Sequence, residues 1–161
     1  MPKIPSIYLE TTIFNFPFAD DAPQYKADTL RLFEEIKTGK FKAFTSRYVI
    51  EELEAATDAQ RGERLKLVKK YGIKVIPASD EIKRFSEVYI SSGIIPKKYA
   101  TDALHIAAAT VANLDFIVSL NFRHIVKRKT IEETEFINYR EGYKKIGIYS
   151  PAEVIDYEKD I

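Results

Sequence analysis

The chain alternates short apolar runs with longer segments in which apolar residues recur every three or four positions. The runs are rich in β-branched and aromatic residues and predict strands at 4–9, 41–46, 73–78, 115–120 and 145–150. The periodic segments predict helices over 24–38, 47–56, 63–72, 80–92, 99–114 and, more weakly, 130–140. Residues 16–23 and 93–98 are expected to be loops. Strands and helices in alternation are typical of an α/β fold with a mostly parallel sheet.

Two polar side chains directly follow predicted strands. Glu10 comes after the strand at 4–9, and Asn121 comes after the strand at 115–120. Ligands of an open parallel sheet bind outside the carboxyl ends of its strands, so we expect both side chains at that edge. A turn would explain either residue as well, since asparagine is frequent in turns. Asp115 lies at the other end of its strand, and we expect it to be structural.

Two helices bring further carboxylates to the same edge. The helix at 47–56 begins there, and Glu52 lies on the border of its apolar stripe. The helix at 99–114 runs antiparallel to the strand after it, which places Asp102 over the same edge. Each acid also has a structural explanation: Glu52 as part of a solvated face, and Asp102 as a partner of the helix dipole. His105 is expected to be a hydrogen-bonded packing residue rather than a ligand.

The predicted topology thus brings four polar side chains together: Glu10, Glu52, Asp102 and Asn121. Three are acids, and like charges held close together raise one another's pKa. A divalent cation would relieve this repulsion, and Mg²⁺ and Mn²⁺ prefer carboxylate oxygens while keeping several waters. Such an ion can activate a water and stabilise charge on a phosphoryl group. The hydroxyls of Thr11 and Thr12 are available to the cluster or to a phosphate.

Composition narrows the class of protein. The 161 residues are enough for one domain with a real core, and we treat 1–161 as a single domain. With no cysteine and two histidines, disulfide scaffolds and thiolate zinc sites are excluded, and a zinc enzyme is not expected. The net charge of +1 indicates no global attraction to nucleic acid. No stretch is long and apolar enough to span a membrane, and the N-terminus lacks a signal-peptide core, so a cytoplasmic protein is expected.

Four motifs resemble those of PIN domains, and of the VapC-type toxin ribonucleases among them. YLETTIF resembles the opening motif, IEEL the internal Glu-Leu, and IVSLNFRHI the polar exit from a strand. TDALHIAAA is the most specific, because it closely resembles the segment that precedes that strand in PIN toxins. The resemblance covers about residues 6–126. Glu10 stands where the family usually has aspartate, and Asn121 stands where it has a carboxylate.

The resemblance implies a three-layer α/β/α sandwich and a Mg²⁺- or Mn²⁺-dependent endoribonuclease. It assigns Glu10 and Asp102 to the metal ion, directly or through water, with Asn121 completing the metal site. It assigns Glu52 to orienting a water or acting as base. The implied reaction is in-line hydrolysis of a phosphodiester that leaves a 5′ phosphate and a 3′ hydroxyl. The resemblance further implies the toxin of a toxin–antitoxin pair, a homodimer, and an antitoxin protein as partner.

Cations and aromatic residues near the motifs are candidates for contact with RNA. Lys97 and Lys98 precede the helix of Asp102, and a second basic group follows Asn121: Arg123, Lys127, Arg128 and Lys129. We take Lys98 and Arg123, with Thr11 and Thr12, as the substrate-binding candidates. The alternative is ordinary surface lysine. Aromatic residues also follow the first motif, at Phe14, Phe16 and Phe18; these could stack on bases, but we expect them to pack in the core or against a partner.

Two other functions are compatible with these residues. One is a PIN-like domain that binds RNA or protein with little or no cleavage, because Asn121 is neutral. The other is an unrelated α/β phosphatase or receiver-like domain. That class uses an aspartate at the end of the first strand as phosphate acceptor, and Glu10 is a poor substitute for it.

Overall fold

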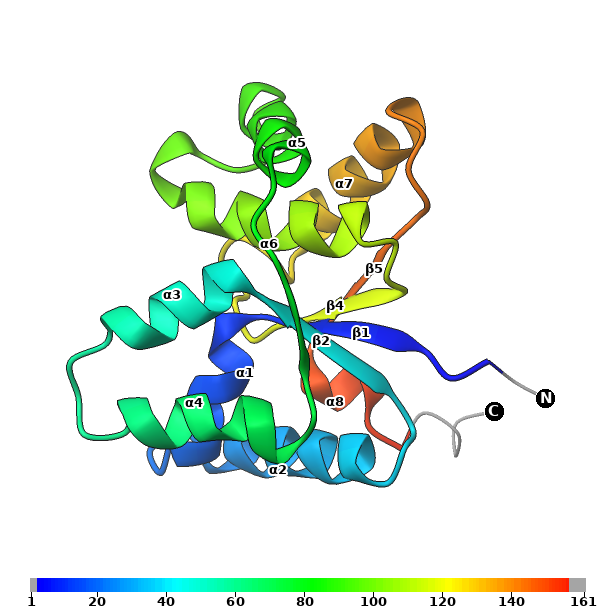
Figure 1. Ribbon diagram of the computed structural model, residues 1–161. Helices are drawn as coiled ribbons and strands as arrows, with labels where there is room; N and C mark the ends of the chain where they lie inside the picture. The colour runs from blue at the N-terminus through cyan, green and yellow to red at the C-terminus, as the bar shows by residue number, and fades with distance from the viewer. Residues whose placement is uncertain (1–2, 157–161) are drawn as a thin grey trace.

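Five parallel strands form one sheet in the order β3-β2-β1-β4-β5 (Figure 1). This computed structural model describes residues 3–156. The strands are β1 (Ser6–Leu9), β2 (Lys42–Ser46), β3 (Lys74–Ile76), β4 (Phe116–Val118) and β5 (Gly147–Tyr149). All four pairings are parallel, with Ile7 aligned to Ala43 on one side and to Phe116 on the other. The five predicted strands and the α/β class are therefore confirmed.

Helices cover both faces of the sheet (Figure 1). On one face lie α1 (Thr11–Asn15), α2 (Pro23–Lys37), α4 (Arg61–Lys70) and α8 (Pro151–Val154). On the other lie α5 (Asp80–Ser91), α6 (Ala100–Val111) and α7 (Arg128–Arg140). The short α3 (Arg47–Ala55) follows β2 and contacts both α4 and α6. Two 3₁₀ turns complete the description, at Phe16–Phe18 and Lys97–Tyr99. The arrangement is an α/β/α sandwich.

The two most apolar segments of the sequence, β1 and α6, lie in the core. Strand β1 is central, and its residues Ile7, Tyr8 and Leu9 are fully buried because helices lie on both sides of them. Helix α6 is buried from Ala103 through Thr110 except at Leu104, since it packs against α5 on one side and the sheet on the other. A helix apolar on nearly all sides is what such a sandwiched position requires.

Helix α1 is the main difference from the predicted elements. It begins directly after Glu10, in a segment whose threonines, aromatic residues and asparagine are weak helix formers. Tertiary packing compensates, since Ile13 and Phe14 are fully buried. The expected loop at 16–23 begins with a 3₁₀ turn, and the short helix α8 was not predicted.

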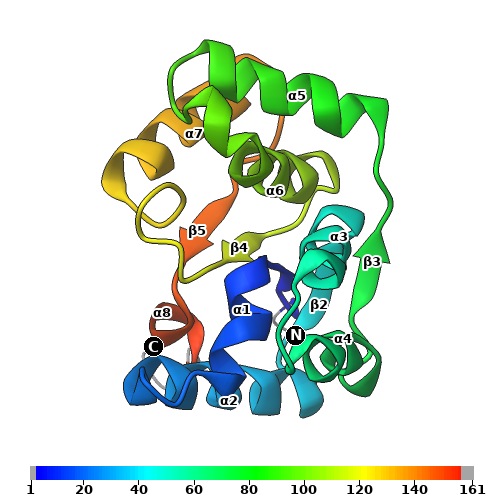
Figure 2. The same ribbon diagram turned by 90° about the vertical axis from the view of Figure 1, so that its left-hand side faces the viewer.

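The strand order locates the topological switch point of the sheet. The chain crosses from β1 to β2 over one face of the sheet and from β4 to β5 over the other, so the switch point lies between β1 and β4. There the N–H of Glu10 donates to the carbonyl of Val118 at 3.2 Å. Figure 2 shows the start of α1 beside the end of β4. Within residues 3–156, no helix is long and apolar enough to cross a membrane.

Candidate active site

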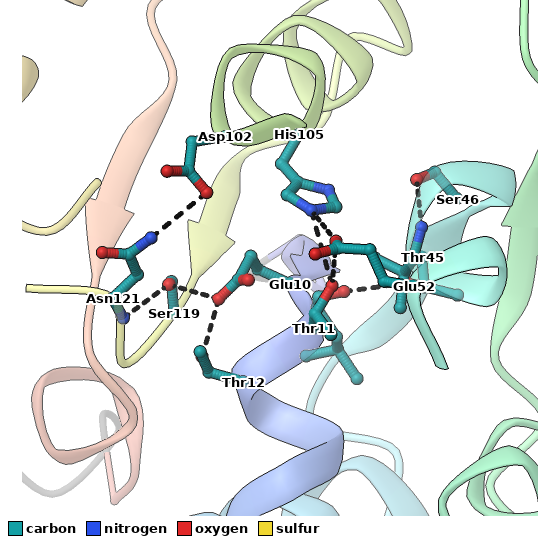
Figure 3. Close-up of polar contacts among 12 residues, drawn as sticks. Glu10, Thr11, Thr12, Thr45, Ser46, Glu52, Asp102, His105, Ser119 and Asn121 are labelled. Atoms are coloured by element: carbon teal, nitrogen blue, oxygen red, sulfur yellow. Dashed lines mark hydrogen bonds and ion pairs between the residues drawn. The ribbon is translucent and has the colours of Figure 1, made fainter. Parts of the chain in front are cut away.

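Glu10 is held at the switch point by two hydroxyl groups. The Thr12 and Ser119 hydroxyls each donate to Glu10 Oε1 at 2.6 Å (Figure 3). The hydroxyls are themselves fixed, because Thr12 Oγ1 accepts from the N–H of Leu120 and Ser119 Oγ from the N–H of Asn121. Glu10 is only 3% exposed. These bonds lock the carboxylate in one orientation, and its Oε2 accepts no hydrogen bond from residues 3–156.

Glu52 is positioned by a buried hydrogen-bonded chain. Its Oε1 lies 2.6 Å from His105 Nε2 and accepts from the Thr11 hydroxyl at 2.6 Å. His105 Nδ1 lies 2.7 Å from the Tyr8 hydroxyl, which lies 2.6 Å from Ser46 Oγ. Five elements are thereby joined: β1, α1, the end of β2, α3 and α6. Because His105 and Tyr8 are fully buried, this chain is rigid.

The pKa shifts of His105 and Glu52 favour the carboxylate form of Glu52. Burial lowers the pKa of His105, but the hydrogen bond and charge of Glu52, with the charges of Glu10 and Asp102, raise it on balance. Burial raises the pKa of Glu52, and the hydrogen bond and charge of His105 with the bond from Thr11 outweigh this and lower it. Both shifts favour the charged forms of the pair, whose Nε2 and Oε1 atoms lie 2.6 Å apart, and the Glu52 side chain is 40% exposed at the rim.

Asp102 lies on the first turn of α6, facing Asn121. Burial raises the pKa of Asp102 to about 6; the charges of Glu10 and Glu52 add to this, while His105 and Asn121 act against it. The Asn121 amide Nδ2 donates to Asp102 Oδ1 at 3.2 Å. The three acids thus lie close enough to repel one another, although they come from three separate elements (Figure 3).

Asn121 presents its amide N–H₂, not its oxygen, to Asp102. Asn121 Oδ1 accepts from the backbone N–H of Arg123 at 3.2 Å and of His124 at 3.0 Å. Two backbone donors fix which end of the amide is oxygen. In this arrangement the amide donates a hydrogen bond that favours the carboxylate form of Asp102, instead of adding a ligand oxygen.

The donor set suits a hydrated divalent ion better than an ion enclosed by protein ligands. Among residues 3–156, no group of three or more histidine, aspartate and glutamate side chains could hold a metal ion. Glu10 Oε2 and Asp102 Oδ2 nevertheless accept no hydrogen bond within that range, and they belong to mutually repelling carboxylates. Mg²⁺ is commonly bound through one or two carboxylates with waters and substrate phosphates in the remaining positions. The residues present fit that mode.

The remaining predicted residues separate into three groups. Thr11 and Thr12 both donate to carboxylates of the cluster, so their hydroxyls are used within the site. Lys98 and Arg123 are exposed, in the turn just before α6 and two residues after Asn121. Asp115 lies at the opposite edge, where burial raises its pKa but bonds from Ser6 and Lys144 prevail and lower it to about 2.

Three residues of the site were not predicted: Tyr8, Ser46 and Ser119. Tyr8 and Ser46 lie within strands and resemble ordinary core and cap residues, and Ser46 does cap α3 by accepting from the N–H of Val49. Ser119 follows β4 as Glu10 follows β1, so its position after an apolar run was a usable signal. His105, expected to be a hydrogen-bonded packing residue, is fully buried with both ring nitrogens bonded.

Comparison with known proteins supports the fold. No family model matches the chain, and no curated protein matches it. A solved structure, described as the crystal structure of VapBC2 from Rickettsia felis bound to a DNA fragment from their promoter, contains a chain similar to this one. The TM-score is 0.55 at 14% identity, over 90% of this chain and 98% of that chain. At this identity the similarity establishes the fold alone.

Proposed function

We propose that this chain is a cytoplasmic, metal-dependent endoribonuclease of the PIN type and the toxin of a toxin–antitoxin pair. The observation that carries the proposal is the gathering of Glu10, Glu52 and Asp102 at the switch point, with the pKa of Asp102 raised to about 6. A cluster of carboxylates at the ligand-binding edge of an α/β sheet favours a divalent cation. The resemblance of TDALHIAAA to PIN toxins and the fold shared with a chain of a VapBC2 structure agree with it.

The three acids have two tasks in this proposal: two of them bind a metal ion, and the third accepts a proton. Glu10 and Asp102 hold a Mg²⁺ or Mn²⁺ ion, which when bound supplies positive charge to a phosphodiester and acidifies water. Glu52 accepts the proton of the attacking water: its Oε1 is occupied by His105 and Thr11, and its side chain is 40% exposed at the rim of the site. The hydrogen bond between His105 and Glu52 keeps the carboxylate in one orientation, and the raised pKa of His105 favours a positive charge beside it.

The orientation of Asn121 favours a second candidate, a domain that binds RNA or protein with little or no cleavage. An N–H₂ group directed at Asp102 adds no ligand oxygen. Fewer carboxylates lower the affinity for a hard cation. The two candidates differ in whether the wild-type protein hydrolyses RNA when Mg²⁺ or Mn²⁺ is added.

Cleavage of a labelled single-stranded RNA by purified protein, in Mg²⁺, in Mn²⁺ and in EDTA, tests the proposal. We expect metal-dependent products with 5′ phosphates. Asp102→Asn and Glu10→Gln should each reduce the rate by roughly 100-fold or more, since each removes a charged ligand at nearly constant volume. Asp115→Asn is the matched control, because it makes the same change at the opposite edge of the sheet.

The outcomes separate the candidates. If the wild type cuts no RNA in either metal and Asn121→Asp gains cleavage, the second candidate is correct. If neither protein cuts, or if Asp102→Asn cuts as well as the wild type, the nuclease proposal fails. An antitoxin partner and a homodimer belong to the same proposal; light scattering gives the mass of the purified chain, and a small neighbouring reading frame for a DNA-binding protein would identify the partner.

A further inference from the structure

An aromatic cluster lies immediately beyond Asn121. Phe122 is 44% exposed and Tyr25, near the start of α2, is 42% exposed. Their ring centroids are 5.7 Å apart at an angle of 33°. Phe16 supports Tyr25 from the edge, at 5.6 Å and 86°, and packs against the core. Tyr25 and Phe122 therefore form an exposed aromatic surface that Phe16 supports from the core side. Phe14, in contrast, is fully buried.

Cations gather beside this surface. Arg123 and Lys127 lie in the same loop as Phe122 and His124, and Lys98 Nζ lies 5.2 Å from the centroid of the Tyr99 ring. Burial lowers the pKa of His124, and the charges of Lys127, Arg123 and Lys98 lower it further. The His124 ring stacks on Tyr99 with centroids 3.9 Å apart. This positive group comes from two segments, the 3₁₀ turn before α6 and the loop after β4, that flank Asp102 and Asn121 in sequence.

We propose that Tyr25 and Phe122 form a stacking site for an unpaired base of RNA, with its flanking phosphates held by the cations of the loop after β4. The proposal deepens the proposed function, on which it rests, by naming the side chains that hold a base of the substrate.

Charge complementarity indicates which kind of ligand the Tyr25–Phe122 surface binds. Exposed aromatic faces next to clustered cations match a polyanion whose charges alternate with flat rings, which describes a nucleic acid strand. The bases of a duplex are stacked on one another and cannot offer a face to Tyr25 and Phe122, whereas bases of a single strand can be splayed onto aromatic side chains. Phe122 follows Asn121 directly, so a base stacked there belongs to a nucleotide near the cleaved bond.

Fluorescence anisotropy with a labelled ten-nucleotide oligoadenylate, at low salt in EDTA, measures binding without cleavage. We expect the wild type to bind this strand about 5- to 100-fold more tightly than an abasic strand of equal length, and more tightly than the same strand in a duplex. Phe122→Leu and Tyr25→Leu should each weaken binding by a similar factor, because leucine keeps apolar volume without a flat face. Phe122→Tyr should bind like the wild type.

Tyr139→Leu is the matched control, since Tyr139 is 85% exposed on α7 outside this cluster. Equal affinity for the full and the abasic strand overturns the proposal whatever the variants do, and assigns the aromatic pair to a protein partner. Leucine variants that fold and bind within twofold of the wild type also overturn it. If the protein cleaves RNA but binds the full and the abasic strand equally, only the stacking site is refuted. If it prefers the full strand but does not cleave RNA, only the nuclease proposal is refuted.

Discussion

Tyr8→Phe removes one buried hydroxyl and no packing volume. That hydroxyl joins Ser46 at 2.6 Å to His105 Nδ1 at 2.7 Å, and all three residues are fully buried. Without it, His105 Nδ1 loses its partner in a place that water does not reach. Because phenylalanine fills the same space, the substitution isolates the polar contribution of the chain that holds Glu52.

The expected cost follows from the two lost bonds. A typical hydrogen bond contributes about 1 kcal/mol net, and a buried polar atom left without a partner costs about 1–3 kcal/mol. Ser46 Oγ keeps the N–H of Val49 as a partner, so only the imidazole is left unsatisfied. We therefore expect the free energy of unfolding to fall by about 2–4 kcal/mol. Without its bond to Tyr8, the imidazole should hold Glu52 less firmly, so that the carboxylate can reorient. The rate of RNA cleavage should therefore fall by more than the decrease in the fraction of folded protein explains.

Urea unfolding gives the change in free energy, and RNA cleavage under conditions where both proteins are folded gives the change in rate. Tyr89→Phe is the control: Tyr89 is equally buried and its hydroxyl donates to Asn138, in the α5, α6 and α7 layer away from the acids. It should lose similar stability without loss of rate. A Tyr8→Phe protein within about 0.5 kcal/mol of the wild type would refute the buried chain, and equal losses of rate in both variants would refute its role in positioning Glu52.

Three further results are expected. The folded pKa of Asp115, about 2, is below the unfolded value of about 3.9, so its stabilisation is present above pH 4 and is lost as the pH falls toward 2. Asp115→Asn should thus lower the free energy of unfolding by about 2 kcal/mol at pH 7 and by almost nothing at pH 2; a difference independent of pH would contradict this. Asn121→Asp should strengthen Mn²⁺ binding about tenfold by calorimetry, since it replaces the N–H₂ that faces Asp102 with an oxygen ligand; unchanged affinity would place residue 121 outside the metal site. Ser119→Ala should cost about 1–3 kcal/mol in urea unfolding, because Glu10 loses a buried donor; a neutral result would show that Thr12 alone holds Glu10.

The fold class was predictable because each element carries its own local signal. The apolar run of β1, the periodicity of α2 and the mostly apolar α6 identify strands and helices without knowledge of their neighbours. Helix α1 was not predictable in this way, since Thr11–Asn15 has little helical propensity and is helical through the burial of Ile13 and Phe14.

The sequence by itself determined which side chains reach the functional edge. Glu10 and Asn121 follow strands, and Glu52 and Asp102 lie near the starts of helices at that edge, so a parallel sheet places all four at one edge. The observed strand order, with β1 between β2 and β4, is what brings them together there. Only the tertiary structure decided how each group is oriented and ionised: the chain from Ser46 through Tyr8 and His105 to Glu52, and the amide of Asn121 turned by two backbone N–H groups. Hydrogen-bond partners and pKa shifts depend on distances of a few ångströms between segments far apart in sequence, and no local pattern of residues encodes those distances.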